Sequence, residues 1–93
     1  MENQHRKIKN YRELTQAEID LMNRIKQKGD ELLELRNEVL THLNQQKQAA
    51  LGVDGELARL LDAEPNRWAN IGKTDIQTGV MALVRAVAQP AGV

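Results

Sequence analysis

The sequence contains no cysteine and no phenylalanine, and aromatic residues make up only 2% of its 93 residues. Without cysteine the chain has no disulfide framework and no thiolate metal site, and His5 and His42 are too isolated to form a zinc site. No apolar run approaches the ~18 residues of a membrane span, and nothing resembles a signal peptide. We therefore expect a cytoplasmic protein that carries no metal and no cofactor.

What is present points to a small helical domain. A chain of this length forms one domain, residues 1–93, and buries only about 60–65% of its unfolded surface, so a monomer would be marginally stable. Leu, Ile, Val, Met and Ala supply the apolar residues, and these favour helices. The sequence predicts an all-α fold that associates with partner chains.

Charge is distributed unevenly, although the formal net charge is zero. Residues 1–29 carry seven Lys/Arg against four Asp/Glu, residues 30–64 carry three against eight, and residues 65–93 carry three against one. An acidic middle argues against binding of a DNA or RNA duplex, while the basic ends permit small local anion sites. The alternative is head-to-tail charge pairing between subunits.

The first half of the chain predicts a basic arm and one long helix. Residues 1–14 are polar and basic without periodicity, and Thr15 to Glu18 has the form of a capping box that starts a helix over residues 15–51. Such a helix, ~50 Å long, outgrows a compact monomer, so part of it is expected to lie against another chain. Its apolar seam follows three-four spacing through Met22, Ile25, Gly29, Leu32, Arg36, Val39 and Leu43. Glycine on this seam costs ~1 kcal/mol against alanine unless close helix approach compensates.

Two further helices are expected. Gly52 ends the long helix, and Asp54 caps a short helix over residues 54–64. Asn66 caps a last helix over residues 66–89. One face of this last helix is expected to be its core side, and the two glycines on it suggest a tight helix crossing: Trp68, Gly72, Ile76, Gly79, Leu83 and Val87.

Catalytic motifs are missing. The Gly72-Lys73-Thr74 stretch is no phosphate-binding P-loop, because Arg67 stands where that motif needs a glycine and no strand precedes it. No Ser/His/Asp or Cys/His set can be assembled, and the carboxylates occupy exposed helical positions. We therefore expect a protein that is not an enzyme.

The first candidate binding residue is Tyr11 in the basic arm. Its ring could stack on a base, which is worth ~1–3 kcal/mol, while a neighbouring cation such as Arg12 meets a phosphate. Lys26 is a further cation, but it lies ~15 Å beyond Thr15 along the helix, so a small ligand reaches both most simply in a site shared by two subunits. The alternative is that Tyr11 only anchors the arm to the helices.

The second candidate is a polar stripe on the last helix. Arg67, Asn70 and Thr74 lie on one side of the helix near its N-terminus, where free N–H groups and a guanidinium favour an anion. Lys73 points away from them. The alternative for Arg67 is a salt bridge to Glu64 or Asp62.

Two stretches resemble the phage anti-CBASS sponge family, which has a helical hairpin domain. The first runs from Tyr11-Arg12-Glu13-Leu14-Thr15 to Met22, and the second from Arg67-Trp68 through Ile71-Gly72-Lys73-Thr74-Asp75-Ile76-Gln77 to Ala88. The resemblance implies a homo-hexameric helical hairpin in the cytoplasm of the infected bacterium. It implies a protein that sequesters the cyclic oligonucleotide signals of bacterial immunity without cleaving them.

The same resemblance assigns residues to two ligand sites. Cyclic dinucleotides are expected between pairs of subunits, with Tyr11 stacking and Lys26 and Arg12 as basic partners. Cyclic trinucleotides are expected where three subunits meet, in contact with Arg67 and Thr74, and the polar stripe adds Asn70. The competing hypothesis is a helical interaction module that binds a host protein and no nucleotide.

Overall fold

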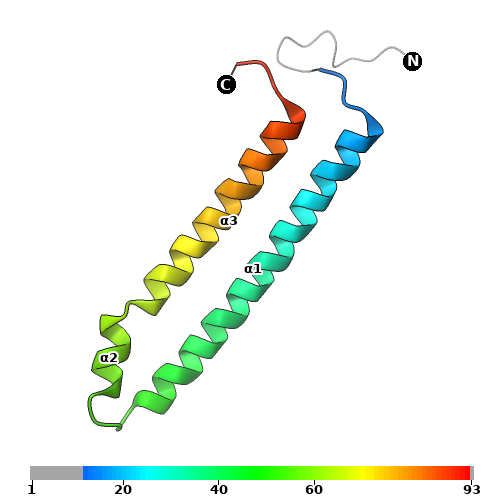
Figure 1. Ribbon diagram of the computed structural model, residues 1–93. Coiled ribbons are helices and arrows are strands. Elements are labelled where there is room, and N and C mark those ends of the chain that lie inside the picture. The colour runs from blue at the N-terminus through cyan, green and yellow to red at the C-terminus, as the bar shows by residue number, and fades with distance from the viewer. Residues whose placement is uncertain (1–11, 93) are drawn as a thin grey trace.

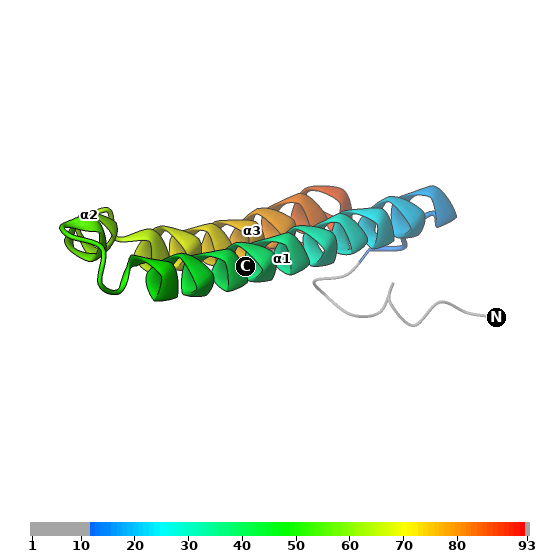
Figure 2. The ribbon, with the colours of Figure 1, turned by 90° about the horizontal axis from the view of Figure 1, so that it is seen from below.

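The computed structural model describes residues 12–92, and all regular secondary structure in them is helical. Its helices are α1 (Gln16–Ala50), α2 (Glu56–Asp62) and α3 (Pro65–Ala88). Figure 1 shows α1 and α3 running antiparallel, with α2 where the chain reverses, and the turned view in Figure 2 keeps them side by side. The all-α prediction is therefore confirmed for the described residues, and the arrangement is a helical hairpin.

Local signals account well for the start of α1. The Thr15 hydroxyl accepts a hydrogen bond from the Glu18 backbone N–H at 3.1 Å, and the Glu18 carboxylate accepts one from the Thr15 N–H at 2.8 Å. The capping box predicted from the sequence is thus confirmed, and it satisfies two of the N–H groups that a helix start leaves free. Of the expected arm, residues 1–11 lie outside the described residues, and residues 12–14 are not helical.

The caps expected for the other two helices are wrong. Gly55 precedes α2 in place of Asp54. Successive turns follow α1, and the last of them ends in a left-handed backbone conformation, with φ of 74° at Gly55, which glycine adopts freely. Glu64 precedes α3 in place of Asn66, and Pro65 occupies the first helical position, where its missing N–H costs no hydrogen bond. The helix ends differ from the expected ranges by at most two residues.

Gly29 marks a close approach between α1 and α3. A Cβ added there would lie 2.5 Å from Cγ2 of Val80, so only glycine allows this approach. The close helix approach that was expected to compensate for the low helix propensity of Gly29 is therefore present. The tight crossing predicted at Gly72 and Gly79 is wrong within the single hairpin, since an added Cβ at either position meets no atom of the chain within 4 Å.

Few apolar residues are buried in this thin hairpin. Among residues 12–92 they are Leu43, Ala50 and Leu60, from α1 and α2. The predicted core positions Trp68 and Leu83 are instead 60% and 57% exposed. The core assignment of these two residues is wrong for the single chain. In a two-helix hairpin each long helix has only one long neighbour, and that neighbour covers a strip narrower than the apolar face of the helix.

The molecule is elongated, with extents of 69 × 23 × 14 Å. Its radius of gyration is 20.5 Å, against about 12 Å for a compact domain of this length. In residues 12–92 no helix combines the length and the apolar character that crossing a bilayer requires.

Candidate functional site

Lys26 borders a hollow between the two long helices. The hollow has a volume of about 560 Å³, and Gly29 and Val80 of the helix seam form part of it. The polar residues that line it include Lys26 and Asp30 from α1 and Gln77 and Thr78 from α3, and the last three were not predicted as site residues. Tyr11, the predicted stacking partner of Lys26, lies outside the described residues.

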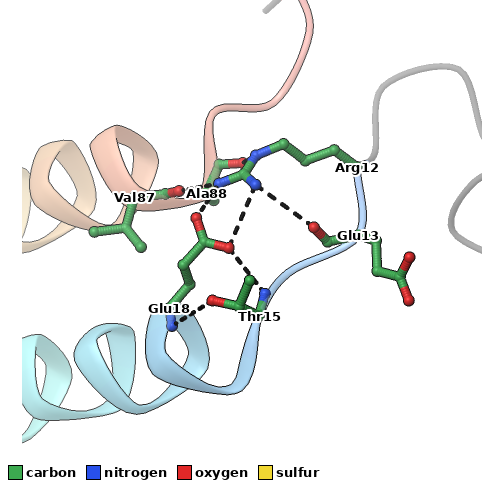
Figure 3. Close-up of polar contacts among 6 residues, drawn as sticks. All are labelled: Arg12, Glu13, Thr15, Glu18, Val87 and Ala88. Atoms are coloured by element: carbon green, nitrogen blue, oxygen red, sulfur yellow. Dashed lines mark hydrogen bonds and ion pairs between the residues drawn. The ribbon is translucent and has the colours of Figure 1, made fainter.

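Arg12 connects three parts of the hairpin (Figure 3). Its Nε donates a hydrogen bond to the carbonyl of Ala88 at 3.0 Å, and its Nη2 donates one to the carbonyl of Val87 at 2.6 Å. Nη2 also pairs with Glu18 Oε2 at 2.5 Å, and Nη1 donates to Glu18 Oε1 at 3.4 Å and to the Glu13 carbonyl at 3.5 Å. All three guanidinium nitrogens are therefore engaged within the hairpin.

Glu18 is strongly acidic as a result of these contacts. The hydrogen bond from Arg12, followed by that from the Thr15 backbone N–H, lowers the pKa of Glu18 from 4.5 to about 2. The same pair raises the pKa of Arg12 above its ordinary value. The pair is therefore fully charged at neutral pH, although both side chains are partly exposed.

Acid should weaken the hairpin through this pair. A carboxylate whose pKa is lower in the folded protein than in the unfolded chain stabilises the fold. For Glu18 this contribution is complete at pH values above the unfolded pKa of 4.5 and is lost as the pH falls through the folded pKa of about 2. We expect the wild-type melting temperature to exceed that of Glu18→Gln at pH 6, with the gap shrinking by pH 2.5. Thermal unfolding followed by circular dichroism checks this. A gap that stays constant between the two pH values would contradict it.

Arg67 lies in the first turn of α3 beside a second hollow of about 430 Å³. Its guanidinium is 3.8 Å from the Glu64 carboxylate and lies over the Trp68 ring, 5.1 Å from the centroid. The salt bridge that we considered as an alternative is thus present, but long, exposed pairs of this kind add little stability. Arg67 remains available to an anion.

The structure places the three residues of the predicted trinucleotide site together. Arg67, Asn70 and Thr74 all line the second hollow, with Ile71 and Asp75. The Thr74 hydroxyl donates to the Asn70 carbonyl at 3.2 Å. Thr74 also borders the Lys26 hollow, so the two hollows adjoin.

Sequence reasoning missed the role of Arg36. Its Nη2 donates to the Asn70 side-chain oxygen at 2.6 Å and its Nε donates to the Ala69 carbonyl at 3.3 Å, which ties the second hollow to α1. The only signal was a cation on an otherwise apolar seam. Such a cation indicates an acceptor on the facing helix but does not identify it.

A third hollow, of about 450 Å³, is apolar. It shares Gly29, Ile76 and Val80 of the seam with the Lys26 hollow, but Leu21, Leu83 and other residues flank it. The third hollow and the Lys26 hollow therefore lie on opposite faces of the hairpin. Within residues 12–92 no group of three His, Cys, Asp or Glu side chains is placed to hold a metal.

Comparison with known proteins agrees with this architecture. The family described as Acb2/Tad1, hairpin domain, matches residues 3–88. Anti-CBASS protein 2 of Pseudomonas phage JBD67 is 55% identical in an alignment 107 positions long, which covers 99% of this chain and 99% of the relative. The chain belongs to the Acb2/Tad1 hairpin-domain family.

Proposed function

We propose that this protein is a phage-encoded sponge that binds cyclic dinucleotides and cyclic trinucleotides without cleaving them and so blocks CBASS immune signalling. The observation that carries the proposal is the near full-length similarity to a protein named Anti-CBASS protein 2. Two adjoining hollows, one with Lys26 and one with Arg67, support two anion sites on one hairpin. The protein would act in the cytoplasm of the infected bacterium, and not as an enzyme.

The cyclic dinucleotide is assigned to Tyr11, Arg12 and Lys26. In this proposal the Tyr11 ring stacks on a base and the ammonium of Lys26 meets a phosphate. A ligand with two phosphates and two bases suits two copies of the same pair, one from each of two subunits. Support comes from the size of the Lys26 hollow and from the polar side chains among its lining residues.

The cyclic trinucleotide is assigned to Arg67, with Asn70 and Thr74 as further polar contacts. Three phosphates related by a three-fold axis match three copies of one guanidinium, which binds phosphate in a bidentate manner. The clustering of these three side chains around the second hollow supports the assignment.

Both assignments require several subunits, and we propose a homo-hexamer. A two-fold axis at one site and a three-fold axis at the other generate six copies when combined. The elongated shape supports association, as do the eleven large apolar side chains that residues 12–92 expose. Helices this long gain stability mainly by packing their apolar faces.

The proposal is tested by titrating the protein with cyclic di- and trinucleotides in a calorimeter and then recovering the ligand. We expect saturable binding, a raised melting temperature with ligand, and release of the intact ring on denaturation. The linear dinucleotide of the same bases is the matched control and should bind weakly, because it lacks the preorganised ring. Absence of binding, or recovery of a cleaved ring, would refute the proposal.

The competing function is a helical module that binds a host protein. The apolar third hollow favours it, since exposed apolar surface marks interaction sites. That function predicts recovery of a host partner in a pull-down together with no affinity for any cyclic nucleotide. The calorimetric titration therefore separates the two functions.

A further inference from the structure

We propose that Arg12 is the positioning residue of the cyclic dinucleotide site, which attaches the arm to the hairpin and does not itself bind the ligand phosphate. This inference rests on the proposed function and deepens it. It changes the part that Arg12 plays, from a basic partner of the ligand to a fixed attachment point for Tyr11.

The contacts of Arg12 lie at the open end of the hairpin, opposite α2, where α1 begins and α3 ends (Figures 1 and 3). The carbonyls of Val87 and Ala88 belong to the last turn of α3, where no backbone N–H of the helix reaches them. A cation is also favoured there by the helix dipole. Arg12 satisfies both carbonyls and pairs with Glu18 in the first turn of α1.

The geometry requires arginine. One planar group donates from three nitrogens to the last turn of α3, the first turn of α1 and the arm's own backbone at Glu13. A lysine ammonium is a single point and cannot span these acceptors together. Because a peptide bond joins Tyr11 to Arg12, fixing Arg12 fixes the point from which Tyr11 departs.

Direct phosphate binding by Arg12 predicts the opposite response to one substitution. In that case Glu18 competes with the ligand for the guanidinium, so Glu18→Gln would leave affinity unchanged or raise it. If Arg12 positions the arm, Glu18→Gln weakens the attachment and lowers affinity. Glutamine also serves in a capping box, so α1 keeps its cap.

The test titrates wild type, Glu18→Gln and Arg12→Lys with cyclic GMP–AMP in a calorimeter. We expect Kd to rise about tenfold in each variant, as for the loss of one charge-assisted hydrogen bond. The matched control is Glu56→Gln, which breaks the Glu56–Arg59 pair (2.6 Å) on α2 at the other end of the hairpin and should leave Kd within about twofold. Unchanged or tighter binding by Glu18→Gln, or wild-type affinity in Arg12→Lys, would overturn the inference.

A second readout separates this inference from the proposed function. Tyr11 is the only tyrosine, so 3-fluorotyrosine labelling gives one fluorine resonance that reports on the arm. We expect that resonance in the ligand-free protein to shift in Arg12→Lys and Glu18→Gln but not in Glu56→Gln. If wild type binds no cyclic dinucleotide, the proposed function fails, and this resonance still decides whether Arg12 positions the arm: a spectrum unchanged in both variants would overturn the inference.

Discussion

Replacement of Gly29 by valine is expected to force α1 away from α3 and to remove a large part of the stability of the hairpin. The new Cβ would lie 2.5 Å from Cγ2 of Val80, and valine adds two methyl groups beyond it. Val80 cannot turn aside easily, because β-branched side chains in helices have one strongly preferred rotamer. Overpacking of this kind costs about 1–3 kcal/mol or more, a large part of the stability of a domain this small.

Denaturant unfolding of the protein at fixed subunit concentration measures the effect of Gly29→Val. The matched control is Gly79→Ala on α3, where an added Cβ meets nothing and alanine should stabilise the helix by about 0.5–1 kcal/mol. The smaller substitution Gly29→Ala also places a Cβ against Val80. Val80→Ala should partly restore the stability of Gly29→Ala, since it removes the methyl group that the new Cβ meets. Equal stability of Gly29→Val and wild type would contradict the close crossing.

Local sequence signals predicted the parts of the fold that depend on local contacts. The capping box needs only Thr15 and Glu18, three residues apart, and it appears as expected. The caps at Asp54 and Asn66 failed because the chain instead enters α2 and α3 through left-handed residues, Gly55 and Glu64, and the turn geometry outweighed side-chain preference.

Contacts between distant parts of the chain were harder to predict. Arg12 and Ala88 are 76 residues apart, and nothing near either residue indicates that a guanidinium meets the end of α3. The helical wheel correctly grouped Arg67, Asn70 and Thr74, because one helix carries all three. The same wheel placed Trp68 in the core, although its side chain is exposed. A wheel shows which residues share a face but not how much of that face the neighbouring helix covers.

Alanine substitution of Lys26 and of Arg67 should strongly weaken binding of different ligands. At a two-fold site one substitution removes two cations, and at a three-fold site it removes three. Each charge-assisted hydrogen bond is worth about 1.5–3 kcal/mol, so Lys26→Ala should weaken cyclic dinucleotide binding by about two to four powers of ten. Arg67→Ala should weaken cyclic trinucleotide binding by at least as much.

Each variant should lose affinity for one ligand and keep its affinity for the other. Calorimetry with cyclic GMP–AMP and cyclic tri-AMP measures this selectivity. Lys28→Ala is the matched control for Lys26, since Lys28 pairs with Glu31 at 3.3 Å and lines the opposite face of the hairpin. Lys73→Ala is the control for Arg67. Tyr11→Ala should follow Lys26→Ala, because stacking and phosphate contact act on the same ligand. If either alanine variant lost both ligands while remaining folded, the two hollows would form one site, and Thr74, which borders both, would lie at its centre.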